Sequence, residues 1–308
     1  MERTEMVVMR TKHVKFFLNV LQMIRWCNNQ VVTVKVYHDG VTFVSNDDSK
    51  SLQGTVSFRS QFFESFEFFR DSRHVFGLSL GSFVDSLGVF AANEGLADLT
   101  IKWPDSTGSV CLQSWFTSDD EYRPVQNTMY ARVTCEEADT PTDYGALFGA
   151  DCSKFLVRSF ILKEAVDDLE WPAAAVDVTI SKDPDRVTLQ AEGDAAGGLE
   201  IELGISDEQT RVSIGNSEPV TNRYKHRHLK IATNIAVNLL QAQSPQVATT
   251  QVTIDEQGLM RIHHVMTATQ ESGATDEEQG GGVSPGVLAQ AVFYINPEDI
   301  LRETQMEP

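Results

Sequence analysis

The chain of 308 residues has only four cysteines and no long apolar run. Cys27, Cys111, Cys135 and Cys152 follow one another at intervals of 84, 24 and 17 residues, which fit no zinc or redox spacing. No Asn-X-Ser/Thr sequon occurs, and no segment approaches the roughly 20 apolar residues of a membrane span. Residues 1–10 lack the apolar centre of a signal peptide. We therefore expect a soluble, intracellular protein with reduced thiols.

The sequence also lacks the common motifs of nucleotide-binding proteins and hydrolases. It has no Walker A sequence, no GxGxxG turn and no GxSxG nucleophile elbow. ATP, dinucleotide and serine-hydrolase chemistry therefore have no motif to support them. We expect no catalytic residue, no metal ligand and no cofactor, and an ATP-driven step would belong to a partner.

Two clusters of carboxylates are candidates for a nuclease site, because a two-metal mechanism needs several converging acids. Asp47-Asp48 and Asp119-Asp120-Glu121 each lie in a predicted turn, however, where Asp is favoured by hydrogen bonds to the local backbone. His263 and His264 are adjacent on a predicted strand, so they point to opposite faces and cannot share one metal ion. We interpret all of these residues as structural.

Positive charge is scarce. The chain has 25 Lys and Arg against 44 Asp and Glu, a formal net charge of −19. A surface this acidic repels a polyanion unless the cations are gathered in one place. The location of the cations is therefore the main clue to function.

The hydrophobic content of 41% is that of a globular protein, and the length suits about two domains.

Periodicity in the first half predicts helices alternating with groups of strands. A strand at 6–10 precedes a helix that begins at Thr11 or Lys12, with one apolar stripe and one polar stripe. The apolar stripe is Val14, Phe17, Leu18, Leu21 and Ile24, and the polar stripe is Lys12, Lys15, Asn19 and Gln22. Strands follow at 31–36, 41–44, 52–58, 66–69 and 75–80, then a helix at 82–92 and strands at 98–103, 109–116 and 129–135.

The second half repeats this order, about 150 residues later. A strand at 154–161 precedes a helix at 162–170, further strands at 176–181, 187–191 and 199–205, a helix from Arg223 or Tyr224, and strands at 249–254, 259–266 and 287–294. We predict an α+β protein of two repeated domains, 1–135 and 153–308, each with two helices on antiparallel sheets. Residues 136–152 would connect them, and the Gly-rich, acidic stretch 271–286 would be a disordered insertion.

The cations concentrate on two of the four predicted helical segments. Lys12, Lys15 and Arg25 lie in 11–25, and Arg223, Lys225, Arg227 and Lys230 lie in 223–235. The segment 162–170 is acidic, with Lys163 against four carboxylates. Such a distribution attracts phosphate to one surface only, and His226 and His228 would extend that surface. The alternative is that these helices simply have solvated faces.

Several short motifs, in order along nearly the whole chain, resemble the sliding-clamp superfamily. They are the turn Ser45-Asn-Asp-Asp-Ser49, the connector, Asn222-Arg-Tyr-Lys-His226 leading into Leu229-Lys-Ile-Ala-Thr233, and Phe293-Tyr-Ile-Asn-Pro-Glu-Asp299. Within it, Val220-Thr-Asn-Arg-Tyr-Lys225 is most similar to the Rad-one family, whose members are subunits of the heterotrimeric DNA-damage checkpoint clamp, the nine-one-one complex. The insertion at 271–286 and the acidic tail 298–307 depart from the family pattern.

The resemblance implies a clamp fold whose helices face a central channel, in a ring of three subunits around double-stranded DNA bound without sequence preference. Lys12, Lys15, Arg227 and Lys230 would line the channel, with Arg25, Lys163, Arg223 and Lys225 as further candidates. The implied partners are a Rad-nine-like and a Hus-one-like clamp subunit, a checkpoint clamp loader, and repair and signalling proteins in the nucleus. No membrane is implied.

The resemblance also implies that an edge strand of one subunit pairs with an edge strand of the next. The matching segments here are 109–116 and 199–205, by β-augmentation. The implied interface residues are Val110, Leu112, Ser114, Phe116, Leu199, Ile201, Leu203 and Ile205. Two other functions stay open at this point: a homotrimeric replication clamp and a 3′–5′ DNA exonuclease.

Overall fold

The computed structural model describes residues 6–69, 74–93, 98–117, 126–150, 152–169, 175–182, 185–192, 197–203, 211–213, 219–234, 249–267 and 287–298. The predicted insertion at 271–286, the acids at 119–121, the acidic tail from residue 299 and the interface residue Ile205 lie outside this part of the chain.

The N-terminal half begins with β1 (Val7–Thr11) and the helix α1 (Val14–Gln22). Five strands follow, namely β2 (Val31–Tyr37), β3 (Gly40–Asn46), β4 (Leu52–Arg59), β5 (Ser65–Phe68) and β6 (His74–Ser79), with the short 3₁₀ helix η1 (Ser60–Phe62) before β5. The helix α2 (Leu80–Ala92) and three strands complete the half: β7 (Leu99–Trp103), β8 (Val110–Thr117) and β9 (Gln126–Val133).

The C-terminal half has the same order. It begins with β11 (Cys152–Arg158) and the helix α4 (Ser159–Asp168), followed by β12 (Ala175–Lys182), β13 (Asp185–Glu192), β14 (Gly198–Leu203), β15 (Arg211–Ser213) and β16 (Val220–Lys225). The helix α5 (His226–Thr233) precedes β17 (Thr249–Asp255), β18 (Met260–Thr267) and β19 (Val287–Ile295). The sequence strand, helix, five strands, helix, three strands thus occurs twice, which confirms the predicted repeat and the α+β class.

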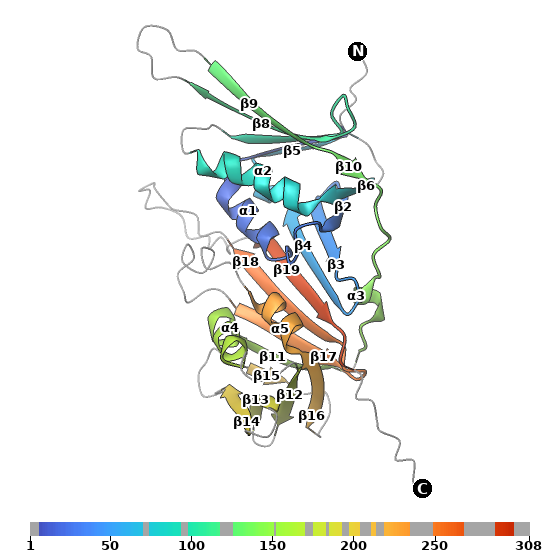
Figure 1. The fold of residues 1–308 in the computed structure, drawn as a ribbon, viewed down its shortest axis with the longest axis vertical. Helices are drawn as coiled ribbons and strands as arrows, with labels where there is room; N and C mark the ends of the chain where they lie inside the picture. The colour runs from blue at the N-terminus through green and yellow to red at the C-terminus, as the bar shows by residue number, and fades with distance from the viewer. Residues whose placement is uncertain are drawn as a thin grey trace, which may run out of the picture.

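Three antiparallel sheets organise these elements. A ten-stranded central sheet has the order β10-β6-β2-β3-β4-β19-β18-β17-β11-β15, in which β10 is the short strand Cys135–Glu136, so strands of both halves share it. The halves meet where β4 pairs with β19, from Leu52 opposite Ile295 to Phe58 opposite Ala289. A five-stranded sheet, β5-β1-β7-β8-β9, lies at one end of the long axis, and a four-stranded sheet, β14-β13-β12-β16, lies at the other (Figure 1).

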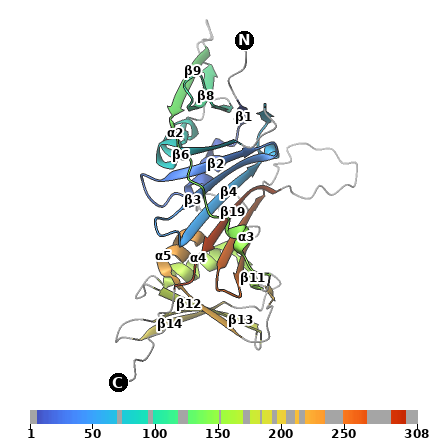
Figure 2. The ribbon, with the colours of Figure 1, turned by 90° about the vertical axis from the view of Figure 1, so that its right-hand side faces the viewer.

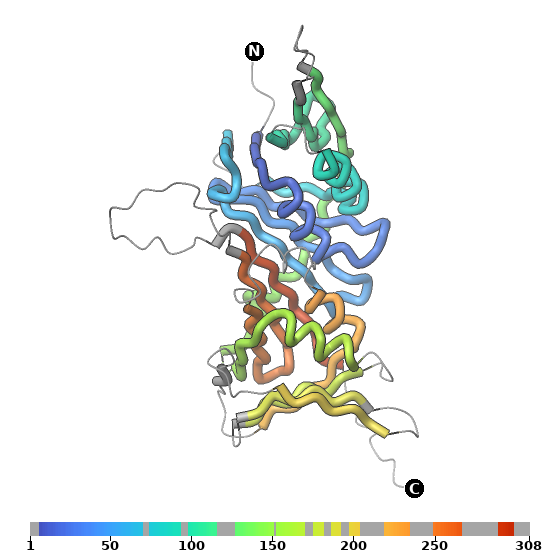
Figure 3. Tube along the Cα trace, turned by 90° about the vertical axis from the view of Figure 1, so that its left-hand side faces the viewer, coloured from blue at the N-terminus to red at the C-terminus, as the bar shows by residue number. Residues whose placement is uncertain are grey.

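The helices α1, α2, α4 and α5 all lie on one side of the central sheet (Figure 1). In the side view of Figure 2, α2 and α5 stand to the left of β4 and β19. Figure 3 shows the yellow-green helix α4 above the yellow strands of the four-stranded sheet. On the opposite side of the central sheet, the described residues form one helix, the short α3 (Tyr144–Leu147), near the margin. The two halves therefore present one common helical face.

The hydrophobic spacing explains why these helices sit as they do. In α1, Phe17, Val20 and Leu21 are fully buried, while Lys15 and Gln22 on the other side are exposed. Phe17 is the centre of an aromatic cluster, with ring centroids 4.6–6.3 Å from those of Phe43, Phe58, Phe62, Phe63 and Phe83. Helix α2 begins where the Ser79 hydroxyl accepts a hydrogen bond from Ser82 N.

Three boundaries differ from the sequence-based expectation. The basic helix begins at His226, so Arg223 and Lys225 belong to β16. Tyr224 between them is buried, whereas Arg223 and Lys225 are not. This alternation of burial fits a strand, in which neighbouring side chains point to opposite faces. The connector is not wholly irregular, because β10 (Cys135–Glu136) pairs with β6 and Asp143 caps α3. The acidic helix begins earlier than predicted, at Ser159.

Candidate nucleic-acid interface

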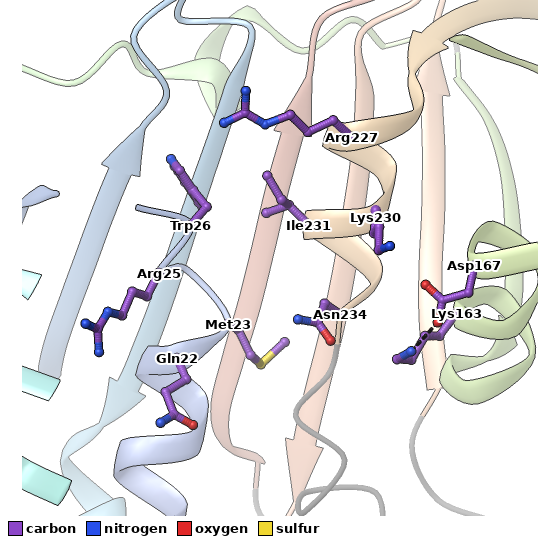
Figure 4. A pocket seen from close by; sticks show the side chains of 10 residues that line it. All are labelled: Gln22, Met23, Arg25, Trp26, Lys163, Asp167, Arg227, Lys230, Ile231 and Asn234. Carbon is purple, nitrogen blue, oxygen red and sulfur yellow. Dashed lines mark hydrogen bonds and ion pairs between the residues drawn. The ribbon is translucent and has the colours of Figure 1, made fainter. Parts of the chain in front are cut away.

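A groove of about 570 Å³ opens on the helical face where the two halves meet (Figure 4). The end of α1 and the chain after it form one wall, and α4 and α5 form the other. Four cations and one carboxylate line it, together with two amides and three apolar side chains. The lining residues are Gln22, Met23, Arg25, Trp26, Lys163, Asp167, Arg227, Lys230, Ile231 and Asn234.

The N-terminal wall is positioned by a buried glutamine. The side-chain oxygen of Gln30 accepts hydrogen bonds from the backbone N–H groups of Trp26 at 2.9 Å and Cys27 at 3.2 Å. The Gln30 amide donates in turn to Ile24 O and to the Ser45 hydroxyl. A fully paired buried amide of this kind holds the chain after α1 in one conformation. Arg25 and Trp26 are thereby fixed at the groove.

The C-terminal wall is positioned by the packing of α5. Leu229 and Ala232 are buried, and the imidazole Nε2 of His226 lies 2.8 Å from Val166 O of α4. This leaves Arg227 and Lys230, three residues apart, on the side of the helix that faces the groove. Arg227 is exposed, and no carboxylate within the described ranges pairs with it.

Arg25 and Lys163 in the groove are each paired with a carboxylate. The guanidinium of Arg25 lies 2.8 Å from Asp85 of α2, and Lys163 pairs with Asp167 one turn along α4. Partly exposed ion pairs of this kind contribute little energy, so phosphate can compete for the cations. Among the described residues that line the groove, four side chains are positive and one is negative, so this part of an acidic protein is electropositive.

The other predicted channel residues lie elsewhere. The ammonium of Lys12 is 2.8 Å from the carboxylate of Glu64. The hydrogen bond and the charge of Glu64 raise the pKa of Lys12. The same hydrogen bond lowers the pKa of Glu64. Lys12 precedes α1 and Lys15 is exposed on it, outside the groove. Arg223 makes two 2.7 Å hydrogen bonds to Asp177 on the neighbouring strand, and Lys225 is exposed at the end of β16.

The expectation that His226 and His228 extend the cationic face is wrong. Both are buried, at 7% and 5% exposure. Burial lowers the pKa of His228, although its Nε2 lies 3.6 Å from an oxygen of Asp47. Burial disfavours the charged imidazole of His228. Both side chains contact neighbouring elements, His226 at Val166 O of α4 and His228 near Asp47, and so do not extend a cationic face.

The prediction that the strand at 109–116 is the edge strand of the N-terminal interface is also wrong. β8 lies between β7 and β9: it pairs with β9 from Val110 to Thr117 and with β7 from Cys111 to Gln113, so it is not the edge strand of the sheet. Val110, Leu112 and Ser114 are buried in the subunit, and the side chain of Phe116 lies outside the described part. The edge of that sheet is β9, where Tyr130 is 56% exposed. Strand order decides this, and the alternation of a single strand does not reveal it.

The second predicted interface segment, 199–205, overlaps β14. β14 is the end strand of the four-stranded sheet, and in the described chain it pairs only with β13. Leu199 is 39% exposed and Ile201 is half-buried, while Leu203 is in the core. β9 and β14 thus lie at opposite ends of the molecule (Figure 1).

The residues considered for metal binding have structural contacts. Asp47 accepts a hydrogen bond from Leu52 N at 2.9 Å and another from the Ser49 hydroxyl, as expected of a turn residue. His264 is buried beneath α5, whereas His263 lies 3.3 Å from Gln290 on the next strand. Within the part of the chain that is described, no three His, Cys, Asp or Glu side chains are placed to hold a metal ion.

No helix within the described ranges is long and apolar enough to cross a membrane.

The fold is that of the sliding clamps. The crystal structure of PCNA from Thermococcus kodakaraensis superposes with a TM-score of 0.67, over 95% of this chain and 100% of that one, at 12% sequence identity. Within this class, residues 6–266 match the family model described as "Repair protein Rad1/Rec1/Rad17". The chain belongs to that family of repair proteins. No curated protein matches it.

Proposed function

We propose that this chain is one subunit of a heterotrimeric ring that encircles DNA in the DNA-damage checkpoint and in repair. The single observation that carries the proposal is the electropositive groove on the common helical face of an otherwise acidic chain. A duplex inside a ring would meet this face. Family membership and the clamp fold support the same role.

Binding to DNA in such a ring needs no recognition of bases. Arg227 and Lys230 attract phosphate from α5, with Arg25 and Lys163 beside them. Contacts to phosphate fix no sequence and depend strongly on salt, so a closed ring can stay on DNA and still slide. The acidic surface elsewhere repels DNA and confines it to this face.

The ring closes through β9 and β14. Both strands have one backbone edge that no described strand covers, and they lie at opposite ends of the subunit. We assign residues 1–135 and 153–308 to two clamp domains joined by 136–152. Exposed Tyr130 on β9 and Leu199 on β14 provide apolar contact area for the neighbouring subunits, and the backbones provide the hydrogen bonds of β-augmentation.

The neighbouring subunits are a Rad-nine-like and a Hus-one-like chain, and this chain does not form the ring alone. In a homotrimer, Glu164 and Asp168, both exposed on α4, would occur three times around the channel. A mixed ring dilutes that repulsion.

A checkpoint clamp loader opens the ring with ATP in the nucleus. The chain itself is a platform for repair and signalling proteins and not an enzyme.

Co-expression with a Rad-nine-like and a Hus-one-like subunit tests this proposal. We expect a complex with one copy of each chain by native mass measurement, and no trimer of this chain alone at micromolar concentration. A stable homotrimer would instead identify a replication clamp. Degradation of DNA with Mg²⁺ or Mn²⁺ by the pure chain, lost in Asp47→Ala/Asp48→Ala at unchanged stability, would identify an exonuclease.

A further inference from the structure

The groove has more than phosphate-binding chemistry. A duplex held by its backbone requires only cations on the surface, yet this site is a hollow that also contains an indole, two amides and two aliphatic side chains. Its volume of about 570 Å³ falls within the range of small-molecule sites, roughly 300–1,000 Å³. These features suit a ligand that is planar, has polar edges and is attached to phosphate.

The indole of Trp26 is built into the site. A β-carbon on Gly54 of β4 would lie 3.0 Å from Cζ3 of Trp26 and 2.9 Å from a methyl group of Ile24, so a larger residue here would force these side chains to shift. Glycine in the interior of a strand is unfavourable unless another group must approach closely. Together with the hydrogen bond from Trp26 N to Gln30, this seats the ring before any ligand arrives.

The groups around Trp26 match the parts of a nucleotide. Arg227 and Lys230 are placed for phosphate, and Figure 4 shows them with Ile231 and Asn234 on the wall opposite Arg25 and Trp26. The amides of Gln22 and Asn234 are exposed and can each donate to and accept from a base edge. Bases stack on aromatic rings with little sequence preference, and cations beside the ring hold the strand.

We propose that this groove binds one unpaired nucleotide of a DNA strand, with its base against Trp26 and its phosphate at Arg227. A base in intact duplex would have to be extruded at a cost in stacking and pairing, whereas a base in a gap is already available. The inference rests on the proposed function and deepens it: the subunit distinguishes gapped from intact DNA inside the ring.

Photocrosslinking tests this binding site. The full chain is mixed with a DNA hairpin that has a short gap with one 5-iodouracil, or with the same labelled strand fully paired, and the crosslinked peptide is mapped by mass spectrometry. We expect a crosslink at Trp26 or Met23, about tenfold stronger on gapped DNA. Trp26→Leu should remove it and Trp26→Phe should restore part of it.

If Trp26→Leu does not fold, substitutions of exposed residues in the groove provide a second test. Gln22→Ala and Asn234→Ala should each weaken the crosslink several-fold, while Gln190→Ala, an exposed amide on β13, should not change it. Equal crosslinking of both DNAs, or gap-dependent crosslinks only outside the groove, would overturn the inference. The proposed function would survive that result if the assembled ring still needed Arg227 for retention on intact duplex, and would fail if it did not.

Discussion

The two halves of the chain have one arrangement of helices on sheets and fill it with different side chains. Beneath α1, five phenylalanine rings surround Phe17. Beneath α4 and α5, the core around Phe155 is aliphatic, and His226, His228 and His264 are buried in the same half. The pattern of burial therefore specifies the fold, and many hydrophobic residues of suitable volume can satisfy it.

The cations of the halves differ in the same way. Before α1, Lys12 is paired with Glu64, whereas Arg227 on α5 faces the groove with no described carboxylate beside it. Two similar clusters in the sequence thus have different electrostatic environments. Neighbours that are distant in the sequence therefore decide how strongly each cluster attracts phosphate.

The largest effect is expected from the aromatic core. Phe17→Ala should lower the free energy of unfolding by about 3–5 kcal/mol, because a large buried ring leaves a cavity. The matched comparison is Phe17→Leu against Phe155→Leu: the first should cost about 1 kcal/mol more, because it also loses aromatic pairs. Denaturant unfolding measures both, and equal costs would show that the aromatic cluster adds nothing beyond its volume.

Acid should destabilise the C-terminal half through His264. Its Nε2–H donates to Ala232 O at 2.8 Å, and its Nδ1 accepts from the Thr250 hydroxyl, so the neutral ring is the paired form. Burial lowers the pKa of His264 to about 4, below its ordinary value. As pH falls through about 6.5 the unfolded chain takes up a proton that the folded chain does not, so stability falls between about pH 6.5 and 4.

The loss expected from His264 is on the order of 3 kcal/mol over that range. His264→Gln keeps a donor and an acceptor but does not titrate. Unfolding measured from pH 7 to 4 should therefore show a smaller loss in this variant than in the natural chain. Parallel curves would contradict the assignment and place the acid sensitivity at other groups.

The two cation clusters should differ in DNA binding. Arg227→Ala/Lys230→Ala should weaken binding of the assembled ring about tenfold at moderate salt, and lower the slope of log K against log salt by about two. Lys12→Ala/Lys15→Ala should have a smaller effect, since Lys12 is already paired with Glu64. Subunit assembly should survive both changes, because neither pair lies on β9 or β14. Equal losses from the two variants would show that α1 and α5 contribute alike.

The smallest effect is expected at Arg223. Its paired hydrogen bonds to Asp177 join β16 to β12, so Arg223→Ala should cost about 1 kcal/mol of stability. It should leave the salt dependence of DNA binding unchanged, because Arg223 lies on a sheet and not in the groove. A reduced slope at unchanged stability would return Arg223 to the DNA-binding surface.

Local patterns of hydrophobic residues predicted much of the fold. The rest was determined by contacts between residues that are distant in the sequence. The repeat follows from spacing that each segment carries itself, as Phe17 and Leu21 show in α1. The start of α5 was misplaced because Arg223, Tyr224 and Lys225 fit a strand and a helix equally well. The edge position of β9 depends on strand order across the sheet, and the neutralisation of Lys12 depends on Glu64, which is far away in the sequence. One local feature of the sequence pointed to Trp26 as a residue of the groove: it is an aromatic residue directly after the cation Arg25.

The central claim is that this chain helps to encircle DNA through its helical face. The most direct measurement is retention of the loaded heterotrimer on closed circular DNA, before and after the circle is cut once, across a salt series. We expect slow release from the circle and rapid release from the linear form, with Arg227→Ala/Lys230→Ala hastening release from the linear form in particular. Equal release rates from circular and linear DNA would contradict encirclement.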